Sequence, residues 1–142
     1  MSVRVLLVDD EEQFVEILAQ RLEARGLKVV TAFSGDEALA KLQGQPLDVV
    51  VLDVLMPGKT GIETLREIKA RMPLVEVIML TGHATVETAI EGMKVGAFDY
   101  LMKPTETVDL VEKINKARRR KADQEERIRQ AEIDRITKSR GW

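Results

Sequence analysis

Short apolar runs rich in Val, Ile and Leu recur along the chain and are separated by longer amphipathic segments. Continuous apolar runs of this kind are typical of strands that lie in a parallel sheet between two layers of helices. We predict five such strands, over residues 3–8, 27–32, 48–53, 75–80 and 98–102.

The segments between these runs have helical spacing. The first carries an apolar stripe at Phe14, Ile17, Leu18 and Leu22 and ends near Gly26. Capping-box spacing opens the next two helices, since Ser34 precedes Glu37 and Thr60 precedes Glu63 by three residues. The inner faces that we expect for the second, third and fourth helices contain Ala38, Leu39 and Leu42, then Ile62, Leu65, Ile68 and Met72, then Ala89, Ile90 and Met93.

The fourth helix should span residues 86–95, and a fifth should run from about residue 106 to near the end of the chain. Strands and helices thus alternate five times. This alternation predicts an α/β fold, a three-layer, doubly wound (βα)5 sandwich with a parallel five-stranded sheet.

Polar residues stand where the strands end. They are Asp9, Asp10, Asp53, Thr81 and Lys103. Ligands of open parallel sheets bind outside the carboxyl ends of the strands, so we expect these side chains to meet in one crevice. Three carboxylates, a hydroxyl and an ammonium group suit a hard divalent cation that holds a phosphoryl group.

Asp53 is the candidate nucleophile, because an aspartate carboxylate can form an aspartyl phosphate. Magnesium bound by Asp53 and Asp10, with Asp9 acting through a ligated water, would offset the repulsion between the two anions. Lys103 and Thr81 would contact phosphoryl oxygens. Taken singly, each residue also has an ordinary explanation as a helix cap, a turn former or a surface lysine, and only their combination argues for a site.

Composition excludes several classes of protein. The chain has no cysteine and one histidine, so disulfides, thiolate chemistry and Cys- or His-rich metal sites are ruled out. No apolar run approaches the length of a membrane span, and the first residues do not resemble a signal peptide. We therefore expect no membrane association and a cytoplasmic location.

Charge divides the chain near Lys116. Residues 1–115 carry more acidic than basic side chains, whereas residues 116–142 carry twice as many basic as acidic ones, although the net charge is only −2. We predict that residues 119–142 are a basic, charged helical extension of the fifth helix. Binding of this helix to a partner or a second copy is an alternative. Nucleic-acid binding by the RRRK run at residues 118–121 is disfavoured by Asp123, Glu125 and Glu126, which follow it, and by the acidic body of the chain.

The segments VLLVDDEE, VVVLDVLMPGKTG, LTGHA and GAFDYLMKP, in this order, resemble the receiver domain of bacterial two-component response regulators. The resemblance covers residues 3–118 and implies a flavodoxin-like sheet with strand order 2-1-3-4-5. The segment from Thr81 to Pro104 is similar to receivers of nitrogen-regulation-type activators. Because only residues 119–142 follow the receiver, too few for an independent fold, we expect a standalone receiver; an N-terminal receiver of a larger transcriptional activator is the alternative.

The resemblance implies a phosphoacceptor role for Asp53 and a metal-binding role for the acidic pair Asp9 and Asp10. The backbone carbonyl of Leu55 would be a further ligand of Mg2+ or Mn2+. Thr81 and Tyr100 match the family's switch pair, although Tyr100 would also suit a half-buried strand position. Lys103 matches the family's lysine, and a cis peptide bond is expected between Lys103 and Pro104.

By the same resemblance the chain is a signalling domain and not an enzyme. It would accept a phosphoryl group from a sensor histidine kinase and present an altered surface of the fourth helix, fifth strand and fifth helix to an unknown downstream protein. A phosphorylation-linked homodimer is one alternative outcome. A magnesium-dependent aspartyl-phosphate hydrolase is disfavoured, because such enzymes carry a second acid where this chain has Leu55.

Leu55 and His83 each stand two residues beyond a predicted site residue. A phosphorelay or proton-shuttle role is conceivable for His83, but we favour a loop position beside the phosphoryl group. There the two side chains would tune how readily water reaches an acyl phosphate.

Overall fold

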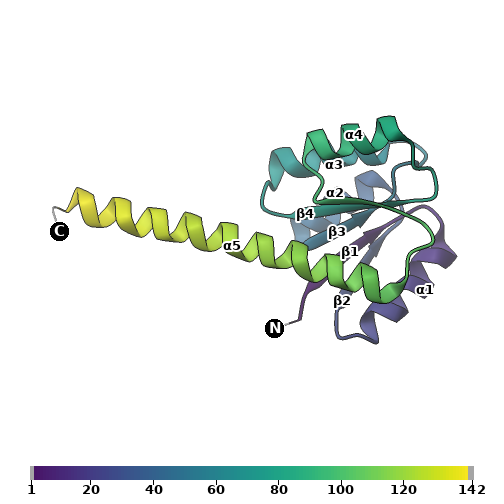
Figure 1. The fold of residues 1–142 in the computed structure, drawn as a ribbon, viewed down its shortest axis with the longest axis horizontal. Helices are drawn as coiled ribbons and strands as arrows, with labels where there is room; N and C mark the ends of the chain where they lie inside the picture. Colours follow the sequence, from purple (N-terminus) through teal and green to yellow (C-terminus); the bar gives the residue numbers. More distant parts are fainter. Residues whose placement is uncertain (1, 141–142) are drawn as a thin grey trace.

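A parallel sheet of five strands forms the centre of the molecule (Figure 1). The structure, a computed structural model, describes residues 2–140. The strands lie in the order β2-β1-β3-β4-β5 and each pairs in parallel with its neighbours. They span Arg4–Val8 (β1), Lys28–Ala32 (β2), Val49–Leu52 (β3), Glu76–Thr81 (β4) and Asp99–Met102 (β5). The predicted fold class and strand order are therefore confirmed.

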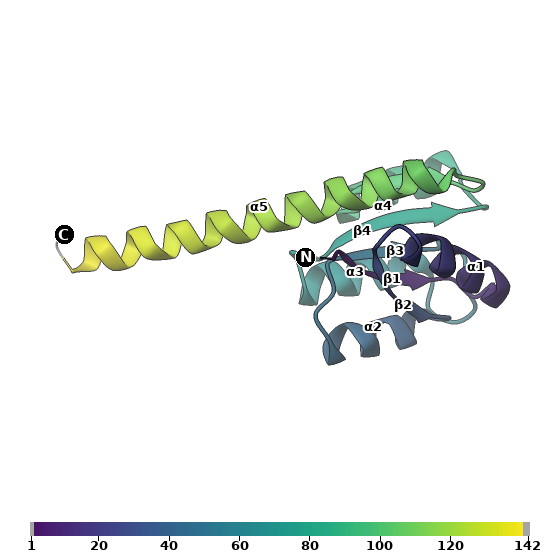
Figure 2. The same cartoon turned by 90° about the horizontal axis from the view of Figure 1, so that it is seen from below.

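The structure describes five helices, which cover both faces of the sheet (Figure 2). They span Glu12–Glu23 (α1), Gly35–Gly44 (α2), Gly61–Arg71 (α3), Val86–Val95 (α4) and Thr107–Ser139 (α5). Helices α1 and α5 pack on one face, and α2 and α3 pack on the other with α4 beside α3.

Two hydrophobic cores result, one on each face, and successive strand residues contribute to them in turn. In β1, Leu6 and Val8 face the core under α2 and α3, whereas Val5 and Leu7 face the core under α1 and α5. Because both faces are covered by helices, both sets of strand residues are apolar. This explains why the strands read as continuous apolar runs.

Side-chain caps fix the starts of α2 and α3, as their spacing predicts. Thr60 accepts a hydrogen bond from the backbone N–H of Glu63, and the Glu63 carboxylate accepts one from the N–H of Thr60, which completes a capping box. Ser34 caps α2 in the same way, but the Glu37 carboxylate accepts from the N–H of Phe33 instead. This hydrogen bond joins the first turn of α2 to Phe33, the residue that precedes the cap.

The prediction for the inner face of α4 is wrong for its large side chains. Ile90 and Met93 are about half exposed, and Gly92 is the one residue of α4 that is buried. A Cβ atom at position 92 would lie 3.5 Å from Tyr100 and 3.6 Å from Ile62, which is ordinary van der Waals contact, so α4 packs on the domain through this residue. Ile17 of α1 is likewise exposed, because α1 turns Val15 and Leu18 toward the sheet instead.

Helix α5 begins on the sheet and continues far beyond it (Figure 1). Its buried residues are Leu110, Ile114 and Ala117, and none of the later residues up to Arg140 is buried. The boundary that we predict near residue 118 stays a prediction, and Trp142 lies outside the described residues. None of the described helices combines the length and apolarity that a membrane span requires.

Asp48, just ahead of β3, is a buried carboxylate held by Arg4. Its Oδ2 accepts the backbone N–H of Arg4 at 2.9 Å, and its Oδ1 lies 3.1 Å from the Arg4 guanidinium. Burial alone would raise the pKa of Asp48, but the hydrogen bonds and charge of Arg4, with a smaller contribution from Lys121, bring the pKa below the ordinary 3.8. The ionised form therefore stabilises the folded protein.

We expect Asp48→Asn to lower the free energy of unfolding by about 2 kcal/mol at pH 7, since hydrogen bonds to charged groups contribute roughly this much. Because the folded-state pKa is depressed, this contribution is complete above the unfolded-state pKa and is lost as pH falls through the folded-state value. Urea unfolding of both proteins from pH 7 to pH 3 should show the gap closing only below about pH 4. A gap that stays constant with pH would contradict an ionic origin.

Candidate functional site

The carboxyl ends of β1 and β3 bring three carboxylates together. Val8 and Leu52 are opposite each other in the sheet, so the residues that follow, Asp9 and Asp53, are neighbours. Ligand oxygens of Asp9, Asp10 and Asp53 all lie within 4.8 Å of one another. Asp9 and Asp53 are buried, whereas Asp10 is exposed. The structure thus joins the three acidic residues that the sequence singles out.

Asp9 is held by two kinds of donor. Its Oδ1 accepts the backbone N–H of Glu11 at 2.9 Å, which orders the turn into α1, and its Oδ2 accepts from Lys103 Nζ at 2.6 Å. Burial is the main influence on the Asp9 carboxyl and raises its pKa above 3.8; the charge of Asp53 adds to this, against the opposing effects of Lys103 and the Glu11 N–H. Burial therefore disfavours the ionised form of Asp9.

Lys103, from the end of β5, is the cation of the site. Its ammonium group lies 3.3 Å from a Glu11 carboxylate oxygen and 4.0 Å from the centre of the Phe14 ring. Burial lowers the pKa of Lys103, but hydrogen bonding to Asp9 and the charges of Asp9 and Asp53 outweigh it and leave the pKa above 10.5. The lysine is therefore charged, and here it pairs with Asp9. The peptide bond between Lys103 and Pro104 is cis.

Sequence reasoning missed Glu11 and Phe14 as neighbours of Lys103. Glu11 directly follows the acidic pair, which was a usable signal, since the turn into α1 keeps it close to Asp9. Phe14 was assigned only to the apolar stripe of α1. Its ring serves both the core and the charged lysine.

Thr81 and Tyr100 lie on adjacent strands and have different partners. Thr81 is fully buried at the end of β4, and its hydroxyl accepts the backbone N–H of His83 at 3.0 Å. Tyr100 is partly buried, and its hydroxyl lies 2.7 Å from Thr88 Oγ1 on α4. The tyrosine is thus joined to α4.

The loop after β3 passes very close to its own return segment. A Cβ atom at Gly61 would lie 2.0 Å from the backbone oxygen of Asp53, so only glycine fits there. Gly58 has a φ of 77°, a left-handed conformation that also favours glycine. The Asp53 carboxylate accepts the N–H of Val54 at 2.9 Å. The loop therefore fixes both the backbone and the side chain of Asp53.

An open pocket of about 540 Å³ lies over the acidic residues. Leu55 and His83 line it together, and the remaining lining residues are Asp10, Glu11, Asp53, Met56 and Pro57. Leu55 is more than half exposed. The pocket gives a ligand access to Asp53 between one apolar and one imidazole side chain.

The pocket with its carboxylates lies at the carboxyl edge of a doubly wound sheet. This is the edge at which α/β proteins of this class bind their ligands. The family described as response regulator receiver domain matches residues 5–115. The chain belongs to this family.

Individual relatives agree with this assignment. The chain is 41% identical over 116 residues to the transcriptional regulatory protein ZraR of Salmonella typhimurium, covering 82% of this chain and 26% of the relative. It therefore spans about a quarter of the length of such curated relatives. A CheY-like receiver from Methanospirillum hungatei has a TM-score of 0.83 at 31% identity, with 87% of this chain and 99% of that chain covered. The NtrX receiver domain from Brucella abortus has a TM-score of 0.76 at 33% identity, with 81% and 98% covered. A nitrogen-regulation-type receiver is consistent with these findings.

Asp9→Asn should raise the free energy of unfolding by about 1 kcal/mol at pH 7 when divalent cations are removed, a common size for stabilising substitutions. The change removes a desolvated charge that Asp53 repels, and the amide oxygen keeps an acceptor for the Glu11 N–H. Chemical denaturation in a chelator would measure it. The matched variant Glu12→Gln, at an exposed position of α1, should change stability little. Destabilisation by Asp9→Asn would show that pairing with Lys103 outweighs burial.

Proposed function

We propose that this chain is the phosphoacceptor of a two-component phosphorelay, with Asp53 as the residue that carries the phosphoryl group. One observation carries the proposal: in a receiver-family chain, Asp53 is buried beside Asp9 and Asp10 at the floor of an open pocket, with Lys103 bound to the same acidic cluster. An Asp53 carboxylate oxygen would form a bond to phosphorus while the phosphorus–nitrogen bond of a kinase phosphohistidine breaks. The electron pair of that bond would remain on the imidazole nitrogen, and the product would be an acyl phosphate.

The acidic cluster also suits a divalent cation. Hard oxygen donors within 4.8 Å of one another are the ligand type that Mg2+ or Mn2+ prefers. Asp10 and Asp53 would hold the ion directly, Asp9 through water, and the Leu55 carbonyl would complete the protein ligands. When bound, such an ion supplies positive charge that lets an anionic phosphoryl group approach. Lys103 and Thr81 would make the other contacts with the phosphoryl group.

Lys103 would move from Asp9 to a phosphoryl oxygen, since its flexible side chain already lies over the same cluster. Thr81 would donate its hydroxyl hydrogen to another oxygen while still accepting the N–H of His83. The resulting shift of Thr81 would favour an inward position of Tyr100 and break its contact with Thr88 on α4. The surface of α4, β5 and α5 would then differ between the two states.

A sensor histidine kinase and a downstream protein are the proposed partners, and a phosphorylation-linked homodimer remains an alternative. The chain would act as a signalling domain that assists its own phosphorylation and dephosphorylation and turns over no external substrate. Leu55 stands where aspartyl-phosphate hydrolases have a second acid, which supports this view. Since ZraR is longer than this chain, a receiver within a larger activator is the second form that the proposal takes.

Intact-mass measurement after incubation with magnesium and acetyl phosphate tests the proposal. We expect one phosphate adduct on the wild type and none on Asp53→Asn, because the amide is not a nucleophile of comparable strength. Asp36→Asn, which changes an exposed aspartate of α2, is the matched control and should still be modified. An adduct that persists in Asp53→Asn would refute the assignment of the phosphoacceptor.

Leu55 and His83 give a second test, because both line the pocket above Asp53. Replacing both by serine should change the lifetime of the aspartyl phosphate at least threefold, as water reaches the phosphorus through a pocket of different size and polarity. Phosphate release from the purified adduct measures it. Ile133→Ser, an exposed change on the far part of α5, should leave the lifetime unaltered. Equal lifetimes in all three proteins would eliminate the tuning role.

A further inference from the structure

Two buried carboxylates that the proposed function does not use lie at the amino-terminal edge of the sheet. Asp48 precedes β3, Glu76 begins β4, and each is about 5% exposed or less. Each has a basic partner in the body of the domain: Arg4 for Asp48, and Lys69, whose Nζ is 3.3 Å from a Glu76 oxygen. The charge of each acid is therefore partly balanced by a basic residue outside α5.

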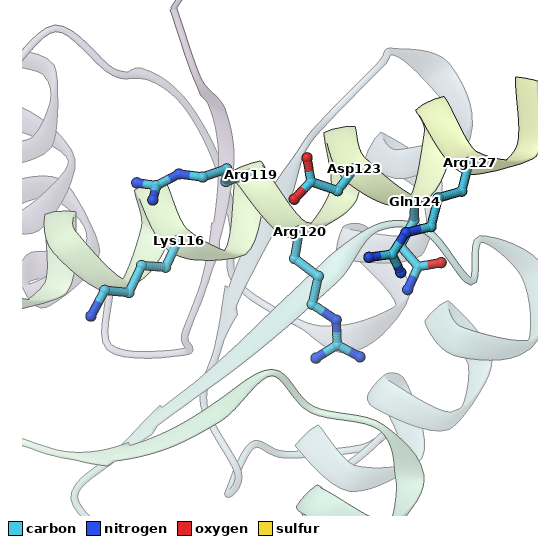
Figure 3. A pocket seen from close by; sticks show the side chains of 6 residues that line it. All are labelled: Lys116, Arg119, Arg120, Asp123, Gln124 and Arg127. Atoms are coloured by element: carbon cyan, nitrogen blue, oxygen red, sulfur yellow. The ribbon is translucent and has the colours of Figure 1, made fainter. Parts of the chain in front are cut away.

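Helix α5 gives each of these acids a second cation. Arg120 Nε lies 2.9 Å from Glu76 Oε2, and Lys121 Nζ lies 3.5 Å from Asp48 Oδ1. The Lys121 side chain is only 13% exposed, so this contact is largely screened from water. In Figure 3 the side chains of Arg120 and Arg119 leave α5 in different directions, and no ion pair is described for Arg119. Neighbouring basic residues thus differ in their contacts.

The position of these pairs along α5 is informative. Leu110, Ile114 and Ala117 form the buried stripe, and Lys121 occupies the next position of the same stripe, where a charge replaces an apolar side chain. Beyond it, the ion pairs and side-chain hydrogen bonds described for residues 122–139 all join neighbours within α5. The two pairs are therefore the last specific contacts described before the helix leaves the sheet.

We propose that Glu76–Arg120 and Asp48–Lys121 form an electrostatic clamp that sets the direction in which α5 leaves the receiver. With the clamp closed, the exposed part of α5 and the sheet move as one body. The clamp contacts β3 and β4 at their amino-terminal ends, and Asp53 and Thr81 lie at the carboxyl ends of the same strands. It does not depend on phosphoryl transfer to Asp53. A partner that binds the exposed part of α5 would meet it at one fixed orientation.

In each pair the acid is buried, and Lys121 is nearly so, whereas the Arg120 side chain is 56% exposed; such pairs suit this role better than a role in stability. Desolvation of the charges offsets much of their attraction, so such pairs add little net stability, yet they specify geometry because a displaced charge loses its partner. Ala117 is the last of the three apolar anchors of α5, so beyond it the two pairs are the described contacts that hold the helix to the sheet. The clamp also explains two residues of the RRRK run: Arg120 and Lys121 are engaged within the domain itself.

Pulsed EPR can measure the direction of α5, because the chain has no native cysteine. One pair of spin labels, at the exposed positions Ala131→Cys and Gln43→Cys, reports the distance from the extension of α5 to α2. A second pair, at Ala131→Cys and the exposed position Glu87→Cys, reports the distance from the extension to α4. Labelled protein is diluted with unlabelled protein, so that only distances within one chain are seen.

We expect narrow distance distributions in the wild type and at least twofold wider ones in the double variant Arg120→Gln/Lys121→Gln. Each buried acid keeps its partner in the body, so this variant should fold. Arg119→Gln/Arg127→Gln removes the same charge from residues without a described ion pair and should stay narrow. The exchange Arg120→Lys/Lys121→Arg keeps both charges and should restore the narrow distribution.

Unchanged widths in Arg120→Gln/Lys121→Gln would overturn the clamp. Equal widening in the control variant would overturn it too, because general charge loss would then explain the effect. Widening accompanied by a fall in far-UV helical signal would have the same consequence, since the helix itself would have unfolded. Asp53→Asn should leave the distributions unchanged, which separates this test from that of the proposed function.

Discussion

The structure depends on negative charge that is buried at one edge of a parallel sheet. Asp9 and Asp53 lie side by side where β1 and β3 end, and burial opposes the ionised form of Asp9. A single lysine, a backbone N–H and the rim position of Asp10 offset this cost only in part. Such a site gains from any ligand that brings positive charge or disperses negative charge. The buried charge of Asp9 is the physical reason why the proposed function includes a cation and a phosphoryl group at this edge.

The opposite edge of the same strands handles charge differently. Asp48 and Glu76 are buried too, but each has two basic partners, and the charges of Arg4 and Lys121 help to hold the pKa of Asp48 low. Among the described residues no buried side-chain oxygen lacks a hydrogen bond, so the edges differ in the number of cations beside each acid: two for Asp48 and for Glu76, and one for Asp9. This difference separates a structural contact from a candidate site more clearly than burial or residue type does.

Several elements were readable from the sequence because local rules govern them. The apolar runs and the capping pair Thr60 and Glu63 follow from the need to cover a sheet on both faces and from backbone geometry. The inner face of α4 was not readable. Its periodicity allowed Ile90 and Met93 to point inward, yet α4 buries Gly92 and leaves both of these side chains about half exposed. A helix near the edge of a sheet packs against fewer elements, so less of its surface is buried. The periodicity of its apolar residues does not show this.

By itself the sequence determined the fold class and the residues at the strand ends, because alternation and chain direction bring the carboxyl ends of parallel strands to one edge. The strand order came from the resemblance of its motifs to receiver domains. Tertiary structure alone decided which charges meet. Lys103 lies on Asp9, with Glu11 and Phe14 beside it, and Arg120 and Lys121 reach acids far away in the chain. Such pairings depend on distances across packed helices and strands, which no local pattern encodes.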